Sequence, residues 1–379
     1  MRIAIVSRRV SGLSGATSII IENARRLAAG GWSVHVYAES LDRDALAQAQ
    51  AHGHRVPAWP WGSYFKRWLF AVVCERLLER GGFDLVHGHG DIFAQDVLSL
   101  HNCVHAAHEA VHGEPLPPGS GVGRIHARML CAGRFRLLIA NSRLMQEDVC
   151  RRFGVPRAKI EVVYPGYAPA RFCAADRPAL RGPMRAKLGV REDEILFGLI
   201  VSGDFVKRAV ATFIEAFSRL RREGVAAKAL VVGKESRLGP YLRRAAREGV
   251  GEALRFLPPM DAIERCYHAL DVCVHPARYE EFGMSVQEAL ACGVPVITGL
   301  QVGAAELLTG APRDFLLRHG DPGELAAKMT TLARDAVLRR RLGELGPAAV
   351  AGNTWDRHFA ATLACYERLL KDSAPKGIS

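Results

Sequence analysis

Short apolar runs alternate with longer mixed segments along the whole chain. Residues 2–6 form the first run, and a helix-length segment follows up to about Ala29. Further runs lie at 34–37, 84–87, 97–100, 137–140 and 160–163. Because buried parallel strands are uniformly apolar, the first half of the chain is predicted to form a parallel sheet covered by helices on both faces.

The same alternation resumes after a stretch rich in Ala, Pro, Arg and Gly at 173–193, which is interpreted as a linker. A helix is predicted at 209–222. Strands are predicted at 195–201, 229–233, 254–257, 271–276 and 294–298. The predicted fold is therefore α/β, with two doubly wound parallel sheets in series. Ligands of such sheets bind beyond the carboxyl ends of strands, so a cleft between the two units is the expected site.

Length and composition fit a globular protein of more than one domain. The chain has 379 residues, 49% hydrophobic and 24% charged, which excludes a disordered or fibrous protein. No stretch approaches the ~20 apolar residues that span a bilayer, and the first apolar run is too short for a secretory signal. Nine scattered cysteines without a Cys-x-x-Cys pair indicate reduced thiols, and hence a cytoplasmic location.

The net charge of +12 is unevenly distributed along the sequence. Residues 1–190 hold 25 Lys and Arg against 15 Asp and Glu, whereas residues 191–379 hold 26 against 24. Nucleic acid, an anionic membrane surface and a phosphorylated substrate are all compatible partners for a basic half. A solvated basic surface without any partner is the alternative.

The most informative motif is a pair of glutamates, Glu280 and Glu288, on either side of a turn that begins a helix. Gly283 in that turn permits close backbone approach, and the first N–H groups of the helix suit a phosphate. Carboxylates repel phosphate but accept hydrogen bonds from hydroxyls, so the two glutamates suit a ribose or a hexose.

With its flanking residues, this Glu-x7-Glu motif resembles that of retaining glycosyltransferases of family 4, which have the GT-B fold. The likeness includes Pro276 and 293–296, and it continues in order along the chain at 84–89, 141–142, 164–172, 231–233, 303–306 and 354–370. It implies two Rossmann-like domains facing across a cleft. These are an acceptor-binding domain at 1–180, a nucleotide-sugar-binding domain at 181–353, and a helix with a tail at 354–379 that crosses back to the first domain.

The resemblance assigns a donor site. Glu288 matches the residue that binds the nucleotide ribose, and Glu280 the one that contacts donor-sugar hydroxyls. The remaining donor-site residues implied are Gly15, Lys207, Arg208, Gly233, Phe282, Gly283, Met284 and Ser285. Asp204 stands where the family commonly has Arg, a variant also seen in its lipopolysaccharide-core glucosyltransferases. Arg208 is favoured over Lys207 as the diphosphate clamp because a guanidinium offers a bidentate fork, and at least one of the two is expected to face solvent.

Fixed cations and helix N–H groups can stabilise a diphosphate leaving group, so transfer without a metal ion or cofactor is expected. His101 matches the family's cleft histidine and is the second candidate catalytic residue beside Glu280. His101, His105, His108 and His112 follow helical spacing, which predicts one stripe. His105 and His108 are candidates for the acceptor side, with a plain exposed helix face as the alternative. A zinc site lacks supporting cysteines.

Residues 59–70 contain six of the 28 aromatic residues, interleaved with basic ones. Trp59, Trp61, Lys66, Arg67 and Trp68 are candidates for contact with an acceptor or a membrane interface. Core packing and sugar stacking are alternatives, and no nucleic-acid module accompanies the stretch.

The sequence thus predicts a retaining hexosyltransferase that uses a nucleotide-sugar, with UDP favoured. The favoured acceptor is an anionic glycan or glycolipid of lipopolysaccharide or other envelope polysaccharide, reached from the cytoplasm or by peripheral membrane contact. A transferase acting on a soluble acceptor and a nucleotide-sugar-binding protein without catalysis are the alternatives. A nicotinamide-dependent dehydrogenase would need Gly-x-Gly-x-x-Gly after the first strand, which 10–17 do not supply.

Overall fold

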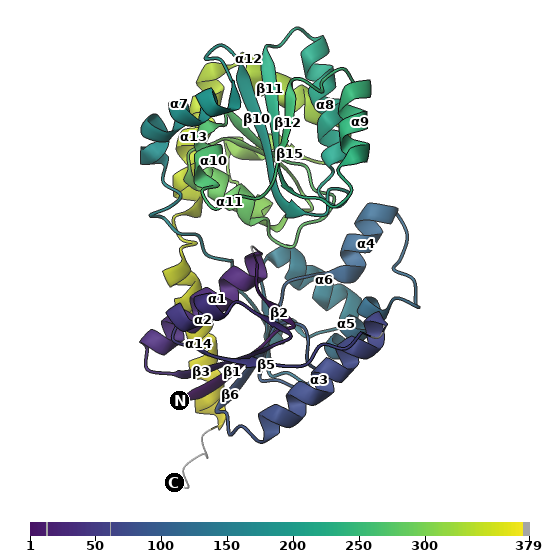
Figure 1. Ribbon diagram of the computed structural model, residues 1–379, viewed down its shortest axis with the longest axis vertical. Coiled ribbons are helices and arrows are strands. Elements are labelled where there is room, and N and C mark those ends of the chain that lie inside the picture. Colours follow the sequence, from purple (N-terminus) through teal and green to yellow (C-terminus); the bar gives the residue numbers. More distant parts are fainter. Residues whose placement is uncertain (13, 61, 374–379) are drawn as a thin grey trace. The chain divides into compact units, whose positions relative to one another are not determined.

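The computed structural model describes residues 1–12, 14–60 and 62–373 (Figure 1). Its internal contacts divide the chain into two compact units. The first unit comprises Met1–Gly166 together with the chain from Trp355, and the second comprises Tyr167–Thr354. The first unit is therefore assembled from two segments that are distant in the sequence.

The first unit is built on a seven-stranded parallel sheet with the strand order β5-β3-β1-β6-β7-β8-β9. Its strands are β1 (Arg2–Val6), β3 (Ser33–Ala38), β5 (His52–Arg55), β6 (Leu85–Gly88), β7 (Val97–Leu100), β8 (Leu137–Ala140) and β9 (Ile160–Val162). A two-stranded parallel ribbon accompanies it, formed by β2 (Arg9–Val10) and β4 (Ser40–Leu41).

Helices connect and cover these strands. They are α1 (Gly15–Ala29), α2 (Arg43–Gln48), α3 (Ser63–Glu79), α4 (Val104–His112), α5 (Gly121–Ala132), α6 (Arg143–Phe153) and α14 (Trp355–Ser373). Serine side chains cap α1, α5 and α6 by accepting a first-turn N–H, as Ser142 does from Met145. Three residues of α14, Cys365, Tyr366 and Leu369, are buried in the same core as β1 and β3, so the last helix completes the first unit.

The second unit contains a six-stranded parallel sheet with the order β12-β11-β10-β13-β14-β15. Its strands are β10 (Ile195–Gly203), β11 (Ala227–Lys234), β12 (Leu254–Leu257), β13 (Val272–His275), β14 (Val296–Gly299) and β15 (Leu316–Leu317). Its helices are α7 (Arg177–Leu188), α8 (Val210–Arg222), α9 (Gly239–Arg247), α10 (Glu264–Ala269), α11 (Met284–Ala291), α12 (Pro322–Arg334) and α13 (Ala336–Val350).

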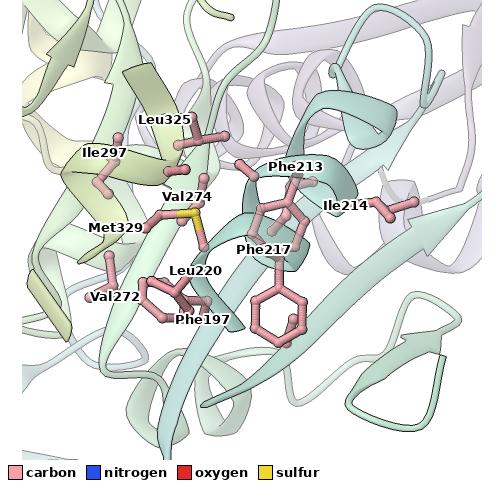
Figure 2. Packing of buried hydrophobic residues seen from close by; sticks show 14 of the residues in the cluster. Phe197, Phe213, Ile214, Phe217, Leu220, Val272, Val274, Ile297, Leu325 and Met329 are labelled. Carbon is pink, nitrogen blue, oxygen red and sulfur yellow. The ribbon is translucent and has the colours of Figure 1, made fainter. Parts of the chain in front are cut away.

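Figure 2 shows how one face of this sheet is buried. Phe213 and Phe217 of α8 and Met329 of α12 pack against strand residues such as Phe197 and Val274, and all five side chains are inaccessible to solvent. Burying side chains of this size gives on the order of 1.5–3 kcal/mol each. This core holds β10 and β13 rigidly, and the loops that follow these two strands carry the site described below.

Two features depart from the sequence-based expectation. The strands predicted from apolar runs are present, but four others were missed: β5, because its sequence, His-Gly-His-Arg, is polar, and β2, β4 and β15, because each has only two residues. The prediction of a linker at 173–193 was wrong. This segment forms α7, which belongs to the second unit and tolerates Pro183 within it.

The charge imbalance changes once the units are known. The first unit holds 24 basic and 17 acidic residues, and the second holds 27 and 22, so their net charges are +7 and +5. The five basic residues from Arg171 to Lys187, which made the first half of the sequence appear basic, lie in the second unit. The charge therefore no longer singles out one unit for an anionic partner.

Candidate active site

In the second unit, the sheet order reverses at the pair β10 and β13. β11 and β12 lie on one side of β10, whereas β13, β14 and β15 lie on the other. The chain leaves these two neighbouring strands in opposite directions, which opens a crevice at their carboxyl ends. The segment 204–209 follows β10, and the segment 276–283 follows β13. Half of the predicted donor-site residues lie on these two segments, and three more lie on α11, which follows directly.

Arg208 and Glu280 meet across this crevice as an ion pair, with side chains only 12% and 13% exposed. Burial alone would raise the pKa of Glu280, but the Arg208 guanidinium and the nearby His275 lower it to about 2. Glu280 is therefore a carboxylate at neutral pH, which can accept hydrogen bonds at both oxygens.

Lys207 and Glu281 form a second pair. The Lys207 ammonium lies 3.0 and 2.7 Å from the two carboxylate oxygens of Glu281, and both side chains are buried. The expectation that Lys207 or Arg208 would face solvent was wrong, because the turn after β10 directs both cations toward glutamates that follow β13.

Asp204 organises this turn. Its carboxylate accepts the backbone N–H of Lys207 at 3.1 Å, and its carbonyl accepts that of Arg208 at 3.0 Å. The residue has a φ of 53°, a left-handed conformation that aspartate tolerates better than most residues. The family's common Arg is thus replaced here by a residue that caps the turn carrying the two cations.

The backbone around Glu280 is fixed by a neighbouring segment. Glu280 donates its N–H to the carbonyl of Gln301 at 2.9 Å and accepts the N–H of Gly303 at 3.0 Å. Gly283 has a φ of 96°, and a Cβ there would lie 3.0 Å from Val302 and 3.3 Å from the Glu280 side chain. Glycine is therefore required both by conformation and by space.

Glu288 occupies a different environment from Glu280. It accepts a hydrogen bond of 2.7 Å from the hydroxyl of Tyr267, which is fully buried on α10. Burial raises the pKa of Glu288 to about 7, against the opposing effect of the Tyr267 hydrogen bond. This carboxyl group therefore changes charge near neutral pH, whereas Glu280 does not.

Sequence reasoning missed His275, the last residue of β13. Its Nε2 atom lies 3.7 Å from a carboxylate oxygen of Glu280, and Ser285 Oγ lies 3.3 Å from its Nδ1 atom. Burial lowers the pKa of His275. Its position at the carboxyl end of a buried parallel strand was the available signal. No comparable signal in the sequence indicated Tyr267.

Three polar atoms converge at this point without an aligned hydrogen bond among the described residues, namely Arg208 Nη1, Glu280 Oε2 and His275 Nε2. All three are buried, and Glu280 Oε2 is ion-paired with Arg208 Nη1 and lies 3.7 Å from His275 Nε2. Buried polar atoms in folded proteins are nearly always hydrogen-bonded, so this convergence favours a polar ligand.

The remaining predicted donor residues have varied surroundings. Met284 and Ser285 begin α11 and are partly exposed, whereas Phe282 is buried. A Cβ on Gly233 would lie 2.9 Å from both Phe205 and the carbonyl of Val201, so internal packing already accounts for that glycine. Gly15, in the first unit, is the first residue of α1 beside its cap Ser14.

In the first unit, the carboxyl ends of β6 and β7 bring histidines together. The Nδ1 atom of His89 lies 2.7 Å from Nε2 of His101, and their rings stack. His87 contacts Ser99 and Tyr366 at 2.7 and 2.6 Å. Burial lowers the pKa of His101 to about 4 and that of His87 to about 3, so both are neutral at pH 7.

The neutrality of His101 can be tested. Between pH 6.5 and 4 the unfolded chain binds a proton at this residue that the folded chain does not. The free energy of unfolding should therefore fall as the pH falls, by about 3 kcal/mol at pH 4. Urea unfolding of His101→Asn should show a shallower loss, while His319→Gln, which changes an exposed histidine, should match the unsubstituted protein. An NMR titration of His101 near pH 6.5 would contradict this assignment.

The predicted histidine stripe was only partly correct. α4 begins at Val104, so His101 lies outside the helix. His105 packs near Phe153 and His126 of neighbouring helices, with ring centroids 5.2 and 5.7 Å away. His108 lies beside His112, at 4.3 Å.

The aromatic stretch forms the start of α3. Trp68 packs against Phe65, which is 45% exposed, and Arg67 lies 3.7 Å from Asp91. Trp59 and Lys66 are partly exposed. Trp61 lies outside the described residues.

Two protein-family models match the chain in order along its length. Glycosyltransferase Family 4 matches residues 13–171, and Glycosyl transferases group 1 matches residues 197–335. The protein belongs to the family 4 glycosyltransferases.

Curated relatives of this glycosyltransferase span almost its whole length. D-inositol 3-phosphate glycosyltransferase of Geodermatophilus obscurus is 28% identical, covering 95% of this chain and 86% of the relative. D-inositol 3-phosphate glycosyltransferase 2 of Catenulispora acidiphila is also 28% identical, covering 98% and 96%.

Solved structures confirm the GT-B fold of this glycosyltransferase. WaaG, a glycosyltransferase involved in lipopolysaccharide biosynthesis, has a TM-score of 0.80 at 20% identity, covering 96% of this chain and 98% of WaaG. Anabaena Alr3699/HepE in complex with UDP and glucose has a TM-score of 0.79 at 19% identity, covering 97% and 100%.

Two further properties bear on the surroundings of the glycosyltransferase site. Over residues 1–12, 14–60 and 62–373, no helix has the length and apolar character needed to cross a bilayer. Over the same ranges, no group of three or more His, Cys, Asp or Glu side chains is placed to hold a metal ion.

Proposed function

We propose that this glycosyltransferase moves a hexose from a UDP-sugar to a hydroxyl of a phosphate-bearing acceptor, with retention at the anomeric carbon. The convergence of Arg208, Glu280 and His275 at the switch point of the second sheet carries the proposal. These groups supply a cation for the leaving diphosphate, a carboxylate for sugar hydroxyls and a neutral ring that accepts or donates one hydrogen bond.

In the proposed reaction, the diphosphate takes the place of Glu280 as the partner of Arg208. Charge on the diphosphate grows as the anomeric bond breaks, so the guanidinium and the first N–H groups of α11 bind the transition state more tightly than the ground state. Glu280, freed from the ion pair, accepts hydrogen bonds from the sugar. Glu288 accepts those of the ribose, which favours its ionised form.

The phosphate-bearing acceptor is supported by the curated relatives, whose names specify D-inositol 3-phosphate. The decisive assay presents UDP-, GDP- and ADP-sugars with either D-inositol 3-phosphate or a lipopolysaccharide-core oligosaccharide, and NMR reports the anomeric configuration of the product. Transfer from a UDP-sugar to the inositol phosphate with retention supports the proposal. Transfer only to the oligosaccharide would replace its acceptor, and tight UDP binding without transfer would indicate a binding protein.

We propose further that transfer needs no metal ion, because Arg208 and Lys207 already place two cations beside the site. Chelation with EDTA should leave kcat unchanged within experimental error. A tenfold loss that Mn²⁺ restores would contradict this prediction. A metal-dependent glycosyltransferase assayed in the same buffer provides the control for chelation.

A further inference from the structure

A pocket of about 530 Å³ lies within the second unit, away from the segments that carry Arg208 and Glu280. Its floor includes Asp271, directly before β13, and Pro295, directly before β14. It therefore lies at the amino ends of the strands, whereas Arg208 and Glu280 follow their carboxyl ends. Helices α7 and α13 provide its walls. Its volume lies within the range of ligand-binding pockets.

Three arginines follow one another at a spacing of four residues along α7, and the first two, Arg177 and Arg181, line the pocket. Arg181 and Arg185 bind the two carboxylate oxygens of Asp271, at 2.6 and 2.9 Å. Arg177 instead donates to the carbonyl of Leu270 at the end of α10. A single carboxylate thus serves two of the three guanidinium groups.

Arg177 is the one of these three arginines that does not form an ion pair with Asp271. Its Nη1 atom is buried and has no aligned hydrogen-bond partner among the described residues. Burial and the neighbouring Arg181 lower the pKa of Arg177 to about 10, so it remains charged at neutral pH. A buried guanidinium nitrogen without a hydrogen-bond acceptor is costly, and a bound anion would relieve this cost.

The opposite wall adds positive charge from α13. Arg339 lines the pocket while donating to the carbonyls of Leu332 and Ala333, and Arg340 beside it is exposed. The pocket lining as described contains four arginines and two acidic residues, Asp271 and Glu344. Because Asp271 is already bound to arginines, the lining has a net positive charge.

We propose that this pocket binds a small phosphorylated anion, in addition to the donor and acceptor of the transfer reaction. Guanidinium groups match the geometry of phosphate oxygens and bind them in pairs. Arg177 supplies the buried donor, and Arg340 supplies a cation at the rim. The site is independent of the crevice that holds Arg208.

Inorganic phosphate and pyrophosphate are the probes, titrated calorimetrically into the full-length chain. Arg340→Glu reverses a rim charge whose side chain is exposed, so the fold should survive. We expect it to weaken the binding of both probes at least tenfold. Arg341→Glu is the matched control, since the next residue of the same helix is exposed but does not line the pocket. It should change the affinity less than twofold.

A variant with an altered donor site distinguishes binding in this pocket from binding at the donor site. Arg208→Gln combined with Glu280→Gln removes the charges of the crevice and leaves a polar side chain at both positions, and thermal unfolding of each variant checks its fold. Phosphate binding that survives in this background and is lost with Arg340→Glu supports the proposal. Equal affinities for the unsubstituted protein and Arg340→Glu would overturn it, as would loss of all binding in the Gln–Gln background.

Discussion

Arg208→Ala is expected to lower kcat by about 100- to 1000-fold, the range for removing one group that stabilises transition-state charge. The substitution also leaves Glu280 buried without its cation, and breaking such a pair costs about 3–5 kcal/mol of stability. In the unsubstituted protein the lowered pKa of Glu280 contributes stability above pH 4.5, which is lost as the pH falls toward 2. In the variant this contribution disappears, and burial makes the ionised carboxylate unfavourable.

Combining Arg208→Ala with Glu280→Gln distinguishes an effect on the transfer reaction from an effect on protein stability. The double variant removes the uncompensated charge, so its melting temperature should recover toward that of the unsubstituted protein while its kcat remains low. Arg243→Ala, which changes an exposed arginine of α9, is the control and should alter neither quantity. Normal turnover in a folded Arg208→Ala variant would exclude the guanidinium as the diphosphate clamp.

The second large expected effect concerns Glu288, whose pKa is about 7 in the folded protein, compared with an ordinary value of 4.5. An acid with a raised pKa binds an extra proton in the folded state, so stability declines as the pH rises from 4.5 through 7. The decline amounts to at most about 3 kcal/mol. Glu288→Gln cannot ionise and still accepts the Tyr267 hydrogen bond. It should therefore be more stable than the unsubstituted protein at pH 8 and nearly equal to it at pH 4.

The same substitution should weaken UDP-sugar binding at pH 8, because a neutral amide accepts ribose hydroxyls less strongly than a carboxylate. Urea unfolding across this pH range and calorimetry with the donor measure the two effects. Glu252→Gln, at an exposed carboxylate, is the matched control. Identical pH dependence of stability in Glu288→Gln and the unsubstituted protein would show that Glu288 does not carry the shifted pKa.

The sequence predicted the two sheets well because nearly every central strand is an apolar run, and the Glu-x7-Glu motif located Glu280 and Glu288 on a turn and its helix. It could not predict that Arg208 pairs with Glu280, since that contact depends on the register of β10 against β13. The contribution of Asp204 to the turn depends on a left-handed backbone that composition does not reveal. The contact of Tyr267 with Glu288 could not be predicted either, because a tyrosine in a short helix of mixed composition resembles any core residue.

The prediction of one histidine stripe at 101–112 was only partly correct, for a different reason. Helical spacing is a necessary property of a helix face, but β7 ends at Leu100 and the chain needs several residues to turn before α4 begins. His101 is therefore positioned by a strand end, like His275 in the other unit. The end of an apolar strand run was therefore a better guide to the position of each histidine in its own unit than the helical period.

The completion of the first unit by α14 has a consequence for the order of folding. Tyr366 is fully buried and contacts His87 at 2.6 Å, across 279 positions of sequence. During synthesis the second unit, which is continuous in sequence, has all its strands before the ribosome releases α14. The core of the first unit cannot be completed until the last helix is made, and we expect this long-range closure to be slower than the folding of the second unit.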